Sequence, residues 1–246
     1  MTTAKRPYAA FDIDGTLIRW QLYHATADYF VKTGLIDQTS FSHISQLRSH
    51  WKERSSLTAF NDYEQQLIKL IDTVFIGLDY SLFKQACEAV FKRYQNQTYI
   101  YTRNLIFDLK KQDYLIFALS ASPLEIIKLV SEYYQFDDFA ASTYEVINHQ
   151  LTGQKKVLLS DDKALELNQM IIRHNAQTKN SIAVGDSPGD KLMLNQAAEP
   201  IAFNPSRELY NTAISNHWKI VIERKNVIYQ LNYKHGQYIL ASTNQY

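Results

Sequence analysis

The chain has 246 residues, enough for one large domain or for a core with a smaller partner. Its 26 lysines and arginines nearly balance 25 aspartates and glutamates, so we expect no nucleic-acid partner. The single cysteine excludes an internal disulfide, and no apolar run is long enough to cross a bilayer. The apolar stretch after Arg6 ends at Asp12, too soon for a signal peptide. These features predict a cytoplasmic protein without a membrane partner.

The first predicted element is a buried strand over residues 8–11, and it leads directly into the sequence DIDGT. In open α/β sheets, ligands bind at the C-terminal ends of the strands, where Asp12 and Asp14 would lie. An aspartate can attack phosphorus and carry the phosphoryl group, while a second carboxyl protonates the leaving oxygen and then activates water. Asp12 and Asp14 are therefore candidate catalytic residues for phosphoryl transfer. That chemistry also needs Mg²⁺, a lysine and hydrogen-bond donors.

Residues 17–97 show helical periodicity throughout. Asn61 and Glu64 resemble a capping box, and Ser81 is a candidate cap for a later helix. Cys87 falls on the apolar stripe of that helix, which favours a core position over a reactive one. Because the helical stretch directly follows the strand that carries the acids, we expect it to form a separate lid.

The α/β pattern resumes with a helix over residues 101–112 and a buried strand over residues 114–119. Ser122, with Pro and Glu at the following first and third helical positions, predicts the start of the next helix. Ser120 has no such structural explanation. Since it ends a strand beside a helix N-terminus, which attracts anions, a role as phosphate ligand is favoured over that of a bystander.

A strand over residues 139–147 and a turn before Gly153 predict a hairpin or flap. The next helix, over residues 162–175, carries Lys163 in its first turn, where a cation is unfavourable against the helix dipole. This placement suggests a nearby anion, with an ordinary surface lysine as the alternative. Lys155 and its neighbour on the flap are weaker candidates for the same role.

A second pair of acids follows a predicted buried strand over residues 181–184, in the sequence GDSPGD. These residue types also favour a plain surface turn, so Asp186 and Asp190 alone would indicate little. Together with the first pair of acids, they favour a Mg²⁺ site shared by two loops, since Mg²⁺ usually takes one or two carboxylates.

The remaining pattern predicts a strand over residues 198–203, a helix over 206–216 and a strand over 219–222. Alternating apolar residues on both sides of a His-Gly turn then predict a hairpin over residues 227–241. Packing at a sheet edge is the simpler role for this hairpin, and a homodimer contact is the alternative.

In chain order, DxDGT, a strand ending in serine, a lysine on a helix and GDxxxD resemble the haloacid dehalogenase (HAD) superfamily of phosphohydrolases. The helical insert resembles the C1 cap of its phosphoserine-phosphatase-like branch, and the resemblance covers about residues 7–222. It implies an α/β fold with a Rossmann-like parallel sheet flanked by helices, formed by residues 1–16 and 99–225. A helical cap over residues 17–98 and a C-terminal β-hairpin extension over residues 226–246 complete the expected organisation.

The resemblance also implies roles for the acids. Asp12 would be the nucleophile and Asp14 the general acid and base. Asp12, the backbone carbonyl of Asp14 and Asp186 would be the ligands of a Mg²⁺ cofactor. Dehalogenase members lack the second acid of the first motif, so Asp14 favours phosphate over halide chemistry.

The resemblance implies roles for four further residues. Ser120 and Lys163 would hold the phosphoryl oxygens, and Asp190 would order the groups around the metal. Phosphoserine phosphatases place a glutamate nine residues after the nucleophile to meet the amino group of the substrate. Here that position is Gln21, a candidate specificity residue without charge, so phosphoserine is not the expected substrate.

The cap offers two further candidates for substrate recognition. Arg48 stands among three cationic residues that could take the place of the substrate-binding arginine of phosphoserine phosphatases; the others are Arg54 and Lys69. Trp20 and Trp51 could form an aromatic pocket for a cationic head group such as phosphocholine, with structural packing as the simpler alternative.

The leading hypothesis is a Mg²⁺-dependent phosphatase that hydrolyses a small-molecule phosphomonoester through an aspartyl-phosphate intermediate. One alternative is a phosphotransferase that passes the group to an acceptor alcohol. The alternative from another class is a catalytically silent protein that binds phosphometabolites. The sequence does not name the phosphomonoester.

Overall fold

A single nine-stranded sheet organises the molecule in the computed structural model, which describes residues 5–158 and 160–245. The strand order is β4-β3-β2-β1-β5-β6-β7-β8-β9. The strands are β1 (Pro7–Phe11), β2 (Leu115–Pro123), β3 (Asp138–Ile147), β4 (Gln150–Lys156), β5 (Gln177–Gly185), β6 (Glu199–Phe203), β7 (Lys219–Arg224), β8 (Val227–Lys234) and β9 (Gln237–Gln245). The helices are α1 (Leu22–Lys32), α2 (Gln38–Lys52), α3 (Ala59–Phe75), α4 (Tyr80–Tyr94), α5 (Ile100–Lys111), α6 (Leu124–Tyr134), α7 (Ser160–Arg173), α8 (Lys191–Leu194) and α9 (Arg207–Ser215), with a short 3₁₀ turn at Pro188–Asp190.

The six strands from β3 to β7 in this order run parallel, as expected for a Rossmann-like core. β1 lies between β2 and β5, with Phe11 paired to Ala118 on one side and to Val184 on the other. Such apolar strands, buried on both faces, are typical of parallel sheets covered by helices. This register brings the C-terminal ends of β1, β2 and β5 to one edge of the sheet.

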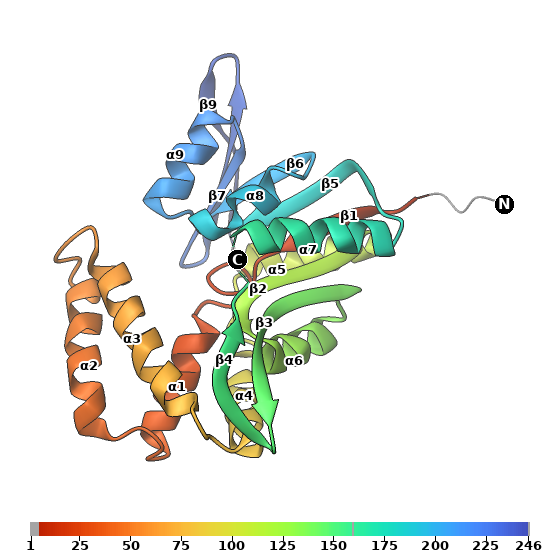
Figure 1. Cartoon of the computed structure of the whole chain (residues 1–246). Coiled ribbons are helices and arrows are strands. Elements are labelled where there is room, and N and C mark those ends of the chain that lie inside the picture. The colour runs from red at the N-terminus through yellow and green to blue at the C-terminus, as the bar shows by residue number, and fades with distance from the viewer. Residues whose placement is uncertain (1–4, 159, 246) are drawn as a thin grey trace.

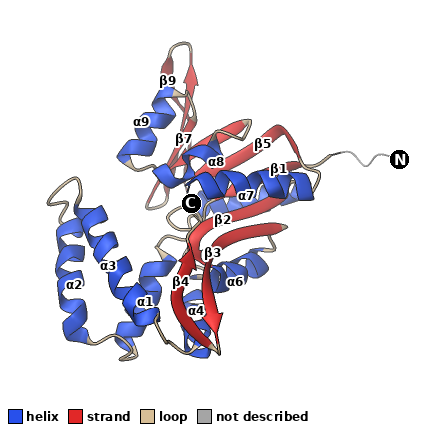
Figure 2. Cartoon of the chain, viewed as in Figure 1, coloured by secondary structure: helices blue, strands red, loops and turns tan. Residues whose placement is uncertain are grey.

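Helices cover both faces of the parallel sheet (Figures 1 and 2). α5 and α6 pack on one face, where Ile106 and Ile127 belong to the same buried cluster as Phe11. α7, α8 and α9 pack on the other, where Leu167 and Leu209 are buried with residues of β2 and β7. The expected parallel sheet flanked by helices is confirmed. None of the helices in the described part of the chain is both long and apolar enough to span a membrane.

Five helices lie between β1 and β2 in the described chain; α5 packs on the sheet, and α1 to α4 form an insert. α2 and α3 pack on each other, and α3 also contacts β4, whereas α4 packs on α6 (Figure 1). Two caps differ from prediction. Asp79 caps α4 by accepting hydrogen bonds from the N–H groups of Ser81 and Leu82, so Ser81 is not the cap. α3 begins at Ala59, N-terminal to the expected Asn61 capping box.

Besides these packing contacts, main-chain hydrogen bonds fix the insert at two places. Its two connecting segments pair with each other: Arg19 N–H donates to Gln97 O, at 2.8 Å, and Tyr99 N–H donates to the carbonyl of Leu17. At its other end, the turn between α3 and α4 is hydrogen-bonded to the β3–β4 hairpin. There the Gly77 N–H donates to Leu151 O at 2.8 Å, and the Leu151 N–H donates back to the carbonyl of Leu78 at 2.9 Å.

The start of α6 also differs from prediction. Ser122 is not its cap; the helix begins at Leu124, and β2 continues as far as Pro123. The chain stays extended there because Pro123 pairs with Ser142 of β3. The Ser122 N–H donates to the hydroxyl of Ser120, at 2.9 Å, which fixes the turn at the end of the strand.

Beyond the parallel strands, β8 and β9 form the predicted C-terminal hairpin and extend the sheet antiparallel to β7. His235 and Gly236 both have positive φ, as a two-residue hairpin turn requires. The Tyr238 hydroxyl bonds the carbonyls of Ala213 and Trp218, both at 2.8 Å, which fastens the hairpin to the end of α9.

Candidate active site

The first motif leaves β1 in a tight turn against the second acidic loop. Asp12 is 4% exposed, and its N–H donates to the carbonyl of Val184 at 3.0 Å. Gly15 has a φ of +83°, and a Cβ at this position would lie 2.3 Å from Oδ2 of Asp186. Glycine is therefore required both for the backbone conformation and for the close approach of the two loops.

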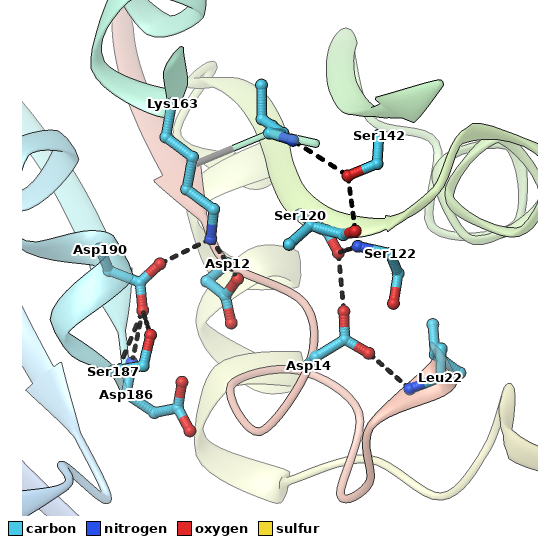
Figure 3. Close-up of polar contacts among 12 residues, drawn as sticks. Asp12, Asp14, Leu22, Ser120, Ser122, Ser142, Lys163, Asp186, Ser187 and Asp190 are labelled. Carbon is cyan, nitrogen blue, oxygen red and sulfur yellow. Dashed lines mark hydrogen bonds and ion pairs between the residues drawn. The ribbon is translucent and has the colours of Figure 1, made fainter. Parts of the chain in front are cut away.

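Lys163 joins the two acidic motifs. Its Nζ donates to Oδ1 of Asp12 and to Oδ1 of Asp190, both at 2.7 Å (Figure 3). All three side chains are buried, and one carboxylate oxygen from each of Asp12, Asp186 and Asp190 lies within 4.8 Å of the other two. The structure thus brings the helix-borne lysine and the acids from two strand ends into one cluster.

Asp190 also fixes the shape of the loop after β5. Its Oδ2 accepts hydrogen bonds from the N–H groups of Asp186 and Ser187 and from the Ser187 hydroxyl, at 3.0 to 3.2 Å. A Cβ on Gly185 would approach Asp190 to about 2.5 Å, so this glycine allows the loop to fold back on itself. Asp190 therefore orients Asp186 while it pairs with Lys163.

Asp14 points away from this cluster, toward β2 and the insert (Figure 3). Its Oδ2 accepts from the hydroxyl of Ser120, and its Oδ1 accepts from the N–H of Leu22, both at 2.6 Å. Since Leu22 is the first residue of α1, the carboxylate satisfies a helix N–H that the Gln21 side chain leaves unpaired. Asp14 is therefore held by one donor at the end of β2 and one at the start of α1.

The site contains four carboxylates and only one ammonium group, so negative charge is in excess. Burial, and then the charge of Asp190, raises the pKa of Asp12 to about 7 despite the opposing effect of Lys163. Burial and the neighbouring charges of Asp12 and Asp190 likewise raise the pKa of Asp186 well above its usual range. The pKa of Lys163 is raised as well, because the two carboxylates outweigh its desolvation. The excess of negative charge favours binding of a cation.

The donor set fits Mg²⁺. Oδ2 of Asp12 is buried and has no hydrogen-bond partner among the described residues, so one lone-pair site at the centre of the cluster is open to a ligand. The available donors are carboxylate oxygens, which Mg²⁺ prefers over the nitrogen and sulfur ligands of zinc. A buried oxygen without a partner is costly, and a bound cation would remove that cost.

On the insert side of the site, aromatic rings pack on one another. The Arg48 guanidinium lies 5.5 Å from the ring centres of Trp20 and Tyr63, and pairs with Asp28 at 2.8 and 2.9 Å. Trp51 stacks on Tyr63 with ring centres 5.6 Å apart. A cation of the chain itself therefore occupies the faces of Trp20 and Tyr63, which favours the packing role for these rings.

Ser142 supports the site but cannot be identified from the sequence. Ser142 is buried in β3, and its hydroxyl donates to the carbonyl of Ala121 at 2.6 Å and accepts from the N–H of Leu158 at 3.0 Å (Figure 3). It thereby joins the end of β2 to the segment that precedes α7 and Lys163. No local signal marks it, because a serine within a strand pattern looks like any other polar position.

Comparison with known proteins identifies the family. A family model for haloacid dehalogenase-like hydrolases matches residues 9–195. The chain therefore belongs to this family. A phosphoserine phosphatase of Streptomyces coelicolor is 29% identical over 118 residues, which are 46% of this chain and 29% of that protein. The matched region thus spans less than a third of the relative's length.

Solved structures with low sequence identity to this chain share its fold. A protein of unknown function from Bordetella pertussis Tohama I has a TM-score of 0.71 at 17% identity, over 89% of this chain and 99% of that one. A phospho-aspartyl intermediate analogue of phosphoserine phosphatase has a TM-score of 0.63 at 20% identity, over 90% and 95% of the two chains. The resemblance to the phosphoserine-phosphatase-like branch is confirmed.

Proposed function

We propose that the protein is a Mg²⁺-dependent phosphatase that hydrolyses a small-molecule phosphomonoester through an aspartyl phosphate on Asp12. The observation that carries the proposal is the lysine shared between acids of two strand ends, with Lys163 Nζ 2.7 Å from both Asp12 and Asp190. Membership in a hydrolase family supports the same reaction class.

The proposed reaction has two steps. A carboxylate oxygen of Asp12 attacks phosphorus, and the bond from phosphorus to the leaving oxygen breaks as Asp14 protonates that oxygen. Water then attacks the phosphoryl group, Asp14 takes its proton, and the bond to Asp12 breaks. Lys163 holds the nucleophile in place and balances charge on the phosphoryl oxygens.

In this proposal Asp12, Asp186 and the backbone carbonyl of Asp14 hold Mg²⁺, which would neutralise charge on the phosphoryl oxygens. Ser120 is proposed as the second phosphate ligand. Its hydroxyl now donates to Asp14, so a bound phosphate would take over that donor. Residues 17–98 are proposed as the cap, because α1 begins at the hydrogen bond to Asp14 and α3 and α4 pack on α1.

The proposed substrate class is based on the names of similar proteins. Proteins that share the fold include enzymes called phosphoserine phosphatase, and small phosphate esters are the substrates we propose here. Gln21, at the start of α1, lacks the charge that would pair with an amino group. We therefore expect an ester other than phosphoserine to give the highest kcat/KM in a panel of phosphometabolites, and phosphoserine at the top of that panel would contradict the role given to Gln21.

The central test replaces the nucleophile. Asp12→Asn should lower Mg²⁺-dependent hydrolysis of an aryl phosphate more than about 1,000-fold, because a carboxamide cannot form the acyl phosphate. Asp108→Asn, at an exposed aspartate of α5, is the matched control and should keep full activity. Robust turnover by Asp12→Asn would refute the assignment of the nucleophile.

A further inference from the structure

An exposed arginine lies in the connection from β1 to α1. The N–H of Arg19 donates to the carbonyl of Gln97, and its side chain is exposed. The guanidinium carbon lies 5.4 Å from the ring centre of Tyr99, a distance at which the ring attracts a cation. Within residues 5–158 and 160–245, no acid forms an ion pair with Arg19. Arg19 is thus a held cation whose charge is not neutralised by a neighbouring carboxylate.

Tyr99 connects this cation to the candidate active site. Its ring packs edge-on against Phe203, at the end of β6, with ring centres 4.9 Å apart. The loop after β6 in turn holds the loop after β5, because the Ser206 N–H donates to the carbonyl of Asp186 at 2.8 Å. Burial and the charge of Asp186 raise the pKa of Tyr99, whereas the charge of Arg19 opposes this rise. Arg19 and the carboxylate of Asp186 are therefore both neighbours of the same tyrosine.

The hydroxyl of Tyr99 is a donor with no described acceptor. Oδ1 of Asn204 accepts from the N–H of Glu223 at 2.8 Å, which leaves the amide nitrogen of Asn204 to donate. A hydrogen bond with Asn204 lowers the pKa of Tyr99, as expected when the phenol oxygen is the acceptor. The phenol proton then remains for a further acceptor.

This pair of donors suits an anion. A guanidinium binds a carboxylate or a phosphate through two parallel hydrogen bonds. The proposed function already assigns Lys163 and Ser120 to the reacting phosphoryl group. On the insert, the guanidinium of Arg48 is paired with Asp28. Arg19 is therefore available for an anionic group in another part of the substrate.

We propose that Arg19 and Tyr99 form a subsite for a second anionic group of the substrate, a carboxylate or a second phosphate. This inference rests on the proposed function, since the first anionic group is the phosphoryl group that Asp12 attacks. It narrows the substrate class to esters with an anionic group at each end, and an ester without the second charge is the poorer substrate.

Three matched esters test the subsite. Ethyl phosphate has no second charge, carboxymethyl phosphate carries a carboxylate, and ethylene glycol bisphosphate carries a second phosphate. In the wild type, kcat/KM for one of the two doubly charged esters should exceed that for ethyl phosphate at least about tenfold, and the better ester identifies the second anion. Arg19→Gln should bring this ratio to within about twofold of one, because KM for the doubly charged ester rises. Tyr99→Phe keeps the ring and should lose a smaller part of the ratio.

Arg93→Gln is the matched control. Arg93 is an exposed arginine of α4 whose guanidinium carbon lies 5.4 Å from the ring centre of Tyr94, so this variant loses the same kind of contact. It should keep the wild-type ratio for all three esters. Equal kcat/KM for the three esters in the wild type would overturn the proposal, as would an Arg19→Gln protein that matches Arg93→Gln.

Binding of inert analogues separates the subsite from the proposed chemistry. In 3-phosphonopropionate, butane-1,4-bisphosphonate and propylphosphonate, a methylene group replaces each ester oxygen of the three esters. In calorimetric titrations with Mg²⁺, one of the first two should bind the wild type at least about tenfold more tightly than propylphosphonate, and Arg19→Gln should remove the difference. That result without hydrolysis of any ester would support the subsite and contradict the phosphatase. Hydrolysis of an aryl phosphate with no effect of Arg19→Gln on binding would do the reverse.

Discussion

A negative charge on Asp186 is costly, and either a bound cation or protonation removes that cost. Asp186 lies among buried carboxylates, and a carboxylate whose folded pKa is raised is stabilising while protonated. For Asp12, with a pKa raised to about 7, this contribution is present below pH 4 and is lost as the pH rises through 7. The metal-free protein should therefore become less stable over this pH range.

Asp186→Asn tests this balance. It should raise the melting temperature of the metal-free protein at pH 8, by about 2–4 °C for each kcal/mol of repulsion removed. The same change should abolish the stabilisation that Mg²⁺ gives the wild type, because a metal ligand is lost. Thermal scans with EDTA and with Mg²⁺ measure both effects. Asp108→Asn should change neither, and a metal-free Asp186→Asn protein that melts below the wild type would contradict the account.

For single residues, the sequence predicts which side chains lie in the site better than it predicts which hydrogen bonds they form. Asp12, Asp14, Asp186 and Lys163 can be selected because each follows a strand or starts a helix, and parallel strands bring those positions together. The hydrogen bond from the Leu22 N–H to Asp14 cannot be seen in the sequence, because a main-chain donor has no residue signature.

Among the elements, α5 depends on a residue far away in the chain. Glu223 of β7 is 7% exposed, and its carboxylate accepts from the N–H groups of Ile100 and Tyr101 at 3.0 and 2.9 Å. A strand thus supplies the cap that the Tyr99 side chain does not provide. The negative charge also lies at the favourable end of the helix dipole.

Glu223→Ala should lower the free energy of unfolding by about 2–4 kcal/mol, because two N–H groups, one of them fully buried, lose their acceptor. Glu223→Gln keeps an acceptor oxygen without the charge and should cost less than half as much. Urea denaturation measures both values. Equal losses for the two variants would show that charge, and not the two hydrogen bonds, dominates at this helix end.

Helix starts illustrate why element boundaries are less predictable than elements. Asp79 and Ser81 are both good caps two residues apart, and only the hydrogen bonds to the Asp79 carboxylate decide between them. Similarly, Pro123 stays in β2 because of Ser142, a pairing partner from another part of the chain. The strand order and the helical insert follow from periodicity; these ends depend on tertiary contacts.

For the molecule as a whole, burial is distributed unevenly between sheet and insert. β1 is almost entirely buried at the centre of the sheet. In α2, only Phe41 and Ile44 of fifteen residues are buried, and the helix packs mainly on α3. Regions with few buried apolar contacts open at lower free energy than the core.

The rate of amide hydrogen exchange should therefore differ between the insert and the central strand of the sheet. We expect amides of α2 to exchange at least about 100-fold faster than those of β1, since an opening that costs 2.7 kcal/mol less is about that much more frequent. Exchange followed by mass spectrometry of peptides measures both segments in one experiment. Comparable protection of α2 and β1 would mean that the insert and the sheet unfold as one unit.

The two attachments of the insert restrict how it can travel. Besides the paired connections of residues 17–19 with 97–99 and the junction of Gly77 with Leu151, α4 packs on α6, and Asp72 of α3 pairs with Lys155 of β4. These contacts hold α3 and α4 against the sheet. α2 packs mainly on α3, so we expect any movement of the insert to be largest at α2, while α3 and α4 stay in place.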